Sequence, residues 1–243
     1  MRDKTEQDGV LHSDYADERA RKKELGFRFR VRGEAVVWAV RRFLEKSSHL
    51  ELLEMGSADG RTLKHIDDTL HLQKGVGIEF NPELIRKAED FPTYLRLLQG
   101  DVTNLEGVDD SSMDIVTALA LLEHLTDPLA AVRQAARVLR PGGLFIATSP
   151  VPFWDHLSTR LGLLAEDIHE CDMHPKYFRE IFAQVDGLEL IHFQRFMWAP
   201  IGLLPYFGVS VSPQKAFALD CAIEKWRLTN FLFVNQLAVV MKT

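Results

Sequence analysis

The sequence predicts an α/β fold with a mostly parallel sheet, and three observations support this prediction. Short apolar runs typical of buried strands alternate with stretches of helical spacing between residues 49 and 148. Asn81-Pro82 and Asp127-Pro128 are typical helix starts, and Pro141-Gly142-Gly143 is typical of a helix end. Hydrophobic residues make up 46% of the 243 residues, which is enough for one sizeable core.

Residues 1–33 are dominated by charged side chains and are predicted to form an N-terminal extension. Phe27–Arg32 alternates apolar and basic residues, a pattern typical of a strand or an extended edge. A solvated arm is the simpler interpretation, and the alternatives are a lid or a surface for an anionic ligand. Residues 34–243 are predicted to form a single domain, which begins with an amphipathic helix over residues 34–46.

Five strands and three helices are expected in the next part of the chain. The strands are expected over residues 49–55, 75–80, 95–99, 113–122 and 144–148, and the helices over residues 60–70, from Pro82 and from Pro128. Alternation at these lengths predicts βαβ units. The C-terminal part differs, because a helix near residues 216–227 separates two more strands, over residues 188–198 and 231–241.

Composition and charge argue against several functional classes. The net charge of −6 gives no global basic surface of the kind that binds nucleic acid. Cys171 and Cys221 have neither metal nor disulfide spacing, and the N-terminus has no apolar signal segment, so a cytoplasmic protein is expected. Prolines and glycines interrupt the longest uncharged run, residues 196–214, which makes it a poor membrane span but leaves peripheral contact with a lipid open.

The residues that follow the predicted strands indicate a ligand-binding edge. Glu54–Gly60 places glycines between a strand and a helix, where the backbone can come close to a ligand. Glu79 ends the second strand, where a carboxylate can accept both hydroxyls of a ribose. Asp101 follows the third strand, at the same edge of a parallel sheet.

This pattern argues against a nicotinamide dehydrogenase and excludes a P-loop. The dehydrogenase fingerprint G-x-G-x-x-G, aligned from Gly56, would have its second glycine at Ala58 and its third at Arg61. The third glycine serves close packing of helix against strand, so Arg61 counts strongly against this class. Asp59 would also repel a diphosphate. No glycine precedes Lys-Ser or Lys-Thr in the frame that a P-loop requires.

In order and spacing, these residues resemble the class I S-adenosylmethionine-dependent methyltransferases, mainly over residues 50–150. The resemblance is carried by Glu54–Gly60, Glu79, Gly100–Val102, Met113–Val116, Leu122–Pro128 and Arg137–Gly143. Ala58 stands where the family has its middle glycine, and alanine is tolerated there if its φ is negative.

The resemblance implies a Rossmann-like sheet of seven strands, mostly parallel, with helices on both faces and the last strand antiparallel. It also implies S-adenosylmethionine as the cofactor. Glu79 matches the acid that binds the ribose, and Asp101 matches the acid that binds the adenine amino group. For His124, contact with the methionine portion and a structural role both stay open. The implied cofactor-binding residues are Glu54, Gly56, Ser57, Ala58, Asp59, Gly60, Glu79, Phe80, Asp101, Val102, Ala118, Leu119 and His124.

The acceptor is expected to bind to residues 153–174 and 196–211, because the cofactor would occupy the loops after the first three strands. His156 and His169 are candidate catalytic bases, since a histidine that titrates near neutral pH can remove a proton from a hydroxyl. His174 precedes Pro175 and is interpreted as a cap or packing residue. The spacing of these histidines and the nearby acids matches no metal motif, so no metal is expected.

We therefore predict a methyltransferase that acts on a small molecule, a lipid or a lipid-linked sugar, with O-methylation favoured. Nucleic acid is not the expected acceptor. The alternative is a non-catalytic cofactor-binding or interaction protein that retains the methyltransferase fold.

Overall fold

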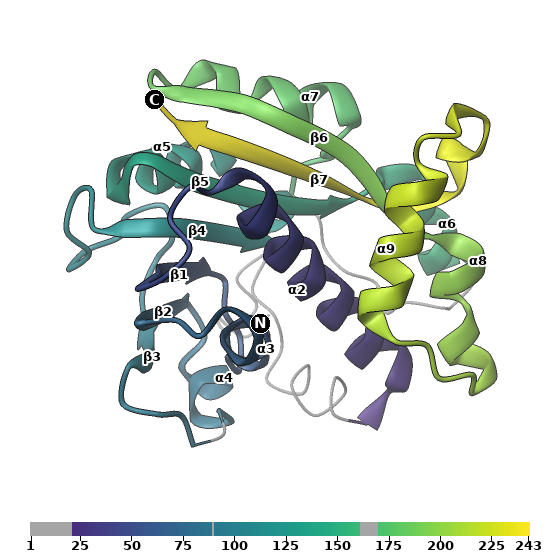
Figure 1. Ribbon diagram of the computed structural model, residues 1–243, viewed down its shortest axis with the longest axis horizontal. Coiled ribbons are helices and arrows are strands. Elements are labelled where there is room, and N and C mark those ends of the chain that lie inside the picture. Colours follow the sequence, from purple (N-terminus) through teal and green to yellow (C-terminus); the bar gives the residue numbers. More distant parts are fainter. Residues whose placement is uncertain (1–20, 89, 161–169) are drawn as a thin grey trace, which may run out of the picture.

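The computed structural model describes residues 21–88, 90–160 and 170–243. Seven strands form one sheet in the order β3-β2-β1-β4-β5-β7-β6 (Figure 1). β7 runs antiparallel to its neighbours β5 and β6, and the other pairs are parallel, which confirms the predicted fold class. The strands are β1 (Glu51–Met55), β2 (Lys74–Glu79), β3 (Leu95–Gln99), β4 (Met113–Leu119), β5 (Leu139–Pro150), β6 (Leu188–Trp198) and β7 (Phe233–Lys242).

Helices cover both faces of this sheet. The α-helices are α2 (Lys23–Phe43), α3 (Arg61–Leu70), α4 (Pro82–Arg86), α5 (Pro128–Val138), α6 (Pro152–Arg160), α7 (Pro175–Glu180), α8 (Ala199–Gly202) and α9 (Pro213–Ile223). The 3₁₀ helices are η1 (Leu122–His124), η2 (Phe182–Gln184), η3 (Leu204–Phe207) and η4 (Arg227–Leu232). Buried side chains of α2, α3 and α9 form one core layer, and those of α5, α7 and η2 form the layer on the opposite face.

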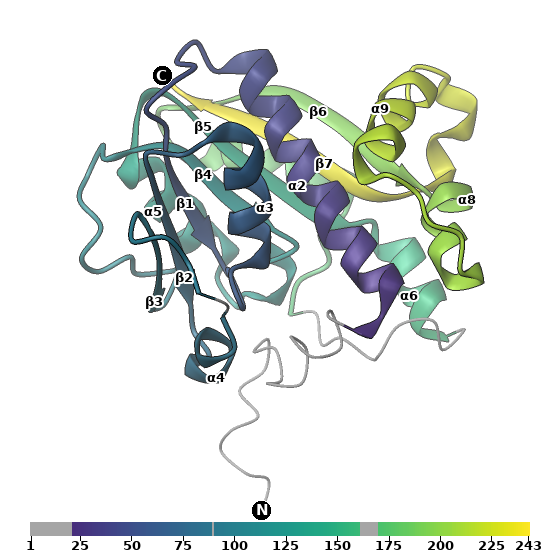
Figure 2. The same ribbon diagram turned by 60° about the horizontal axis from the view of Figure 1, so that its bottom comes forward.

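The N-terminal part of α2 corrects the prediction for Phe27–Arg32, which is helical and not extended. Phe27 and Val31, four residues apart, are 3% and 0% exposed and pack on one helix face. An alternating pattern of six residues also places Phe27 and Val31 four positions apart, so it is compatible with one face of a helix as well as with a strand. The helix runs diagonally across the sheet (Figures 1 and 2) and spans the predicted boundary at residue 33. Residues 1–20 of the predicted extension lie outside the described residues, so the lid stays a prediction.

Gly33 explains how α2 comes close to α3. A Cβ atom built on Gly33 would lie 2.5 Å from Cδ2 of His65 on α3, so a larger residue would displace the His65 side chain or the helices. His65 Nε2 lies 3.1 Å from Oε1 of Glu34, the residue that follows Gly33. The helix α2 contains the last part of the predicted extension, and α3 follows the loop Glu54–Gly60. These two helices are therefore in direct contact.

Two helix starts agree with the capping signals. Asn81 Oδ1 accepts a hydrogen bond from Glu83 N at 2.9 Å, and Asp127 Oδ1 accepts one from Ala130 N at 3.0 Å. The end of α5 differs from the prediction. The helix ends at Val138, and Leu139 pairs with Met113 of β4 before Pro141-Gly142-Gly143, which lies within the longer β5. A register shift between Met113 and Ile115 accommodates this early pairing.

Among the helices that the structure describes, none combines the length and the apolar character required to cross a bilayer.

Candidate functional site

The strand order reverses at β1, whose neighbours β2 and β4 are both parallel to it. Met55 at the end of β1 pairs with Ile78 of β2 and with Ala118 of β4. The three strands therefore end together, and their following loops share one edge of the sheet. Such a switch point is where open α/β sheets bind ligands.

The loop after β1 has a sharply constrained backbone. Gly56 and Gly60 have φ values of 71° and 74°, and Ala58 between them has φ 48°. This corrects the expectation of a negative φ at Ala58, because the alanine adopts the left-handed conformation that glycine occupies more readily. A Cβ atom on Gly56 would lie 2.7 Å from Cδ1 of Leu121, so the loop also needs glycine there for space.

Glu79 joins this loop to the end of β2. Its Oε2 accepts a hydrogen bond from Ala58 N at 2.8 Å, and its Oε1 accepts one from Asn81 N at 2.9 Å. The side chain is buried, and burial raises the pKa of Glu79 above its usual value while these N–H groups oppose the shift. The negative charge of Asp59 raises this pKa further. A carboxylate has lone pairs beyond these two bonds, so it can accept further donors.

Two more acids are buried in the same region. Glu54, in β1, is 2% exposed and Asp59 is 1% exposed. Arg61 contacts Asp59 twice, with its Nε 3.2 Å from Oδ2 and its backbone N 3.4 Å from Oδ1. The arginine that occupies the position of a third fingerprint glycine therefore offsets one of the buried charges. This ion pair is not among the features predicted from the sequence, although Asp-x-Arg at a helix start is a usable signal.

The other predicted cofactor residues also follow strands at this edge. Asp101, after β3, is exposed, and its Oδ1 accepts hydrogen bonds from Thr103 N at 2.8 Å and Thr103 Oγ1 at 2.7 Å. Val102 is 7% exposed, whereas Phe80 is 48% exposed. The remaining members are Ser57, which is buried, Ala118 and Leu119 at the end of β4, and His124, which is half-buried in η1.

Glu123 is a further buried acid, to which the sequence analysis gave no role. It lies in η1, directly after β4, and is 1% exposed. Its carbonyl oxygen accepts a hydrogen bond from Cys171 N at 3.1 Å, which joins the loop after β4 to the chain after α6. An acid directly after the apolar residues 118–122, which end the fourth predicted strand, was the available signal.

Of the two candidate bases, only His156 lies among the described residues. His156 lies on α6, its side chain is 68% exposed, and its Nε2 is 3.8 Å from Asp172 Oδ1. His174 makes the equivalent contact, with its Nε2 3.9 Å from Asp172 Oδ2. His174 occupies the position before α7, but its side chain makes no capping hydrogen bond, so only its place in the chain fits a cap. His169 lies outside the described residues.

The uncharged segment 196–211 divides into a buried and an exposed part. Phe196 and Met197 lie in the core, whereas Leu203, Phe207 and Val209 are 39%, 78% and 48% exposed. The segment includes α8 and η3, which lie with α6 and α9 at the right-hand end of Figures 1 and 2, beyond the end of β5. Part of the predicted acceptor wall is therefore a core element.

Asp220 connects α9 to the end of β6. Its carboxylate accepts hydrogen bonds from Met197 N at 2.7 Å and Trp198 N at 2.9 Å, the last two residues of β6. Burial raises the pKa of Asp220 to about 6, although both N–H groups act in the opposite direction.

Comparison with known proteins adds a family to this geometry. A family described as "Methyltransferase domain" matches residues 53–147, from β1 to β5. A probable S-adenosylmethionine-dependent methyltransferase of Mycolicibacterium smegmatis is 26% identical over 109 residues, covering 45% of this chain and 41% of that protein. A ubiquinone biosynthesis O-methyltransferase of Xanthomonas oryzae is 36% identical over 78 residues, covering 30% of this chain and 33% of that protein. The chain thus spans less than half the length of these curated relatives.

Likeness to solved structures extends over the whole fold. The methyltransferase in a complex with the Haloferax volcanii Trm112 methyltransferase activator superposes with a TM-score of 0.64 at 19% identity. The alignment covers 96% of this chain and 99% of that one. At this identity the likeness shows the fold, and it includes the C-terminal strands and helices that the family match does not reach.

Proposed function

This chain belongs to the class I S-adenosylmethionine-dependent methyltransferase family, whose cofactor is S-adenosylmethionine. From that premise we propose that it transfers a methyl group to a small-molecule, lipid or lipid-linked sugar acceptor, with O-methylation favoured. Residues 53–147 carry the membership, and the activity of the whole chain is the proposal. The cofactor would bind at the shared edge of β1, β2, β3 and β4.

The observation that carries this proposal is the group of buried acids beside the glycine-containing loop. Glu54, Asp59 and Glu79 are 2%, 1% and 6% exposed, and Arg61 forms an ion pair with Asp59. S-adenosylmethionine carries positive charge on its sulfonium and on its amino group, so a site rich in buried carboxylates favours it. The same site disfavours the diphosphate of a nicotinamide dinucleotide.

The proposed contacts follow the order of the strands. Glu79 would accept the ribose hydroxyls, and a ligand that donates hydrogen bonds would stabilise a carboxylate whose pKa burial has raised. Asp101 and Val102 would hold the adenine, the first by accepting from its amino group and the second by apolar contact. Glu54–Gly60 would surround the methionine portion, with Phe80, Ala118, Leu119 and His124 completing the walls.

When bound, S-adenosylmethionine supplies a methyl group on a positively charged sulfur that a nucleophile can displace in line. The protein then has to hold the acceptor oxygen in line with that bond and exclude water. His156 and His169 are the proposed bases for a hydroxyl acceptor. His156 also lies near a carboxylate on the proposed acceptor side, with its Nε2 3.8 Å from Asp172 Oδ1.

For the acceptor we propose a small molecule with an apolar part, a lipid or a lipid-linked sugar, and not nucleic acid. The exposed side chains at the α6, α8 and η3 end of the molecule support this class, because Phe153, Leu203 and Phe207 are 65%, 39% and 78% exposed. Peripheral contact with a membrane belongs to the same proposal, and sedimentation with vesicles of anionic phospholipid tests it. Cys171 and Cys221 are both free thiols, which supports the proposed cytoplasmic location.

Two measurements test the proposed function. Calorimetry should detect S-adenosylhomocysteine at micromolar affinity and NAD far more weakly, and comparable binding of NAD would overturn the cofactor assignment. Incubation with methyl-labelled cofactor and a metabolite extract should then yield a labelled product. Cofactor binding with no labelled product in any extract fraction would favour the non-catalytic alternative.

A further inference from the structure

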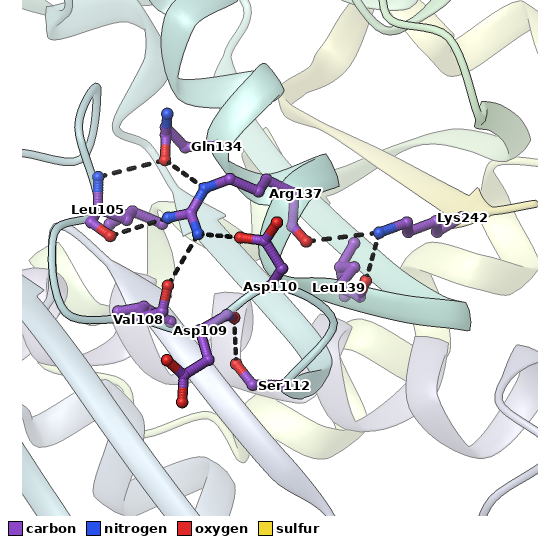
Figure 3. Close-up of polar contacts among 9 residues, drawn as sticks. All are labelled: Leu105, Val108, Asp109, Asp110, Ser112, Gln134, Arg137, Leu139 and Lys242. Atoms are coloured by element: carbon purple, nitrogen blue, oxygen red, sulfur yellow. Dashed lines mark hydrogen bonds and ion pairs between the residues drawn. The ribbon is translucent and has the colours of Figure 1, made fainter.

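The loop between β3 and β4, residues 100–112, is bound at three of its residues by one arginine side chain of α5 (Figure 3). Arg137 Nη2 donates to the carbonyl oxygen of Leu105, and its Nη1 donates to the carbonyl oxygen of Val108, both at 2.8 Å. Nη1 also contacts Asp110 Oδ1. The guanidinium therefore binds three residues along six positions of one loop.

Gln134, one helical turn before Arg137, binds the other backbone group of Leu105. Its Oε1 accepts hydrogen bonds from Arg137 Nε at 3.0 Å and from Leu105 N at 3.3 Å. Both backbone groups of Leu105 thus bond to side chains of α5, and Leu105 O also accepts a longer hydrogen bond from Val108 N at 3.4 Å. Leu105 itself is 2% exposed and lies in the core layer that includes α5.

Local hydrogen bonds connect Leu105 to the start of the loop. Asn104 N donates to Asp101 O at 3.0 Å, and Thr103 N and Oγ1 both donate to Asp101 Oδ1. Val102 and Leu105 are buried in the same core layer. A displacement of Leu105 therefore moves the turn that presents Asp101 and Val102.

The far end of the loop is fixed by the backbone of the same residue. Ser111 N donates to Arg137 O at 3.0 Å, and Ser112 N donates to Val138 O at 2.8 Å. These bonds lie beside Met113 and Leu139, the first pair between β4 and β5. Arg137 thus acts from the opposite end of the strands to the edge where the cofactor would bind, so it cannot touch the cofactor itself.

We propose that Arg137 is a positioning residue for recognition of the cofactor's base, acting through residues 101–110. The proposal rests on the proposed function, because it takes Asp101 as the acceptor of the adenine amino group. Arginine is needed because its planar fork binds two carbonyl groups at once, which the point charge of lysine cannot do. Without the hydrogen bonds of Arg137, we expect Leu105, and with it Asp101, to be less firmly positioned.

Calorimetry on Arg137→Lys with two ligands tests this role. S-adenosylhomocysteine carries the amino group that Asp101 would bind, and its hypoxanthine counterpart carries an oxo group instead. The unaltered chain should prefer the adenine ligand by about tenfold or more, the effect of one hydrogen bond to a charged group. Arg137→Lys should weaken the adenine ligand by about tenfold and the hypoxanthine ligand much less, so that the preference falls.

Arg133→Lys is the matched control, because Arg133 is exposed on the same helix. It should leave both affinities unchanged. Amide hydrogen exchange at residues 101–105 should rise in Arg137→Lys and not in the control. If Arg137→Lys does not fold, Gln134→Leu removes the acceptor for Leu105 N and should lower the same preference to a smaller extent.

The outcomes separate this inference from the proposed function. Failure of the unaltered chain to bind S-adenosylhomocysteine would count against the proposed function. An undiminished preference in Arg137→Lys would overturn the positioning role while leaving the function intact. An equal loss of both ligands would also overturn it, because that result describes a general loss of structure and not of base recognition.

Discussion

Glu79 and Asp220 are buried carboxylates that perform the same local task at two different places in the molecule. Each accepts hydrogen bonds from two backbone N–H groups at or beyond the end of a strand. Burial raises the pKa of both carboxyls. Glu79 lies where the strand order reverses, and Asp220 lies on α9 against the end of β6.

The surroundings of the two acids differ in a way that separates ligand chemistry from structure. Glu79 bonds to the loop of Ala58, and the charge of Asp59 contributes to its raised pKa. Asp220 lies on α9, where Ala216 and Phe217 are also buried, and it accepts hydrogen bonds from backbone N–H groups of β6. A buried acid that accepts backbone N–H groups is therefore not a ligand site by itself. The glycine-containing loop and the second acid distinguish Glu79.

The largest expected effect is the pH dependence of stability that Asp220 contributes. Its carboxyl has a pKa of about 6 in the folded chain, against 3.8 without burial, so the folded state binds the proton more tightly. The contribution of Asp220 to the free energy of unfolding should therefore be greatest below about pH 4 and fall as pH rises between about 4 and 6. The fall should be on the order of 2–3 kcal/mol.

Denaturant titrations at several pH values measure this term. Asp220→Asn should show a flatter profile than the unaltered chain across that interval, because the amide does not titrate. Glu224→Gln, at the end of the same helix, should leave the profile as it is. Parallel pH profiles for Asp220→Asn and the unaltered chain would show that the pKa of Asp220 is not raised, and Asp220 would then differ from Glu79 in this property.

Glu79→Ala should weaken binding of S-adenosylhomocysteine by about 1.5 to 3 kcal/mol, the range for loss of a charged hydrogen-bond partner. The fold should persist, because the strand pairing of β2 does not depend on this side chain. Circular dichroism and calorimetry on one sample measure both properties.

Glu83→Ala is the control for that variant, since Glu83 is an exposed residue of the neighbouring α4 that pairs with Arg86. Its affinity for S-adenosylhomocysteine should equal that of the unaltered chain. An unchanged dissociation constant in Glu79→Ala would show that Glu79, like Asp220, serves only the backbone.

The smallest expected effect on binding is at the acceptor side. His156→Ala should lower turnover by a factor of about 10 to 100, since water replaces part of the work of an exposed base. Cofactor affinity should stay within about 0.5 kcal/mol, the scale for a change away from the binding contacts. His169→Ala is expected to act in the same way.

His174→Ala is a close control, because His174 is 66% exposed and 3.9 Å from Asp172, against 68% and 3.8 Å for His156. It should retain full turnover on the identified acceptor. Equal losses in His156→Ala and His174→Ala would assign the effect to Asp172 and its surroundings. Full turnover in both His156→Ala and His169→Ala would remove histidine base catalysis.

The sequence was informative where local pattern decides structure. Asn81 and Asp127 cap the helices that their position before proline predicts, and β3 and β6 begin and end at the predicted residues. Glu79 was identified because the end of a strand fixes where an acid lies. These features depend on neighbours within a few positions of the chain.

Features that depend on distant packing were missed. Phe27–Arg32 fits a strand by alternation, and only contact with other elements selects the helix face that carries Phe27 and Val31. The positive φ of Ala58 depends on a bond to Glu79, which lies 21 positions away. Glu123 and Asp220 look like surface acids until the segments that cover them are known.

The position of β7 has a consequence for the order in which the chain can fold during synthesis. β6 is made before β7, yet its pairing in the described sheet is with β7, and β7 also covers the free edge of β5. A nascent chain that ends before residue 233 therefore presents β5 as an open edge, with β6 lacking its strand partner. The cofactor half of the sheet can form early, and the last ten-residue strand closes the molecule. A ribosome-stalled chain should accordingly be sensitive to protease after β5 until β7 has emerged.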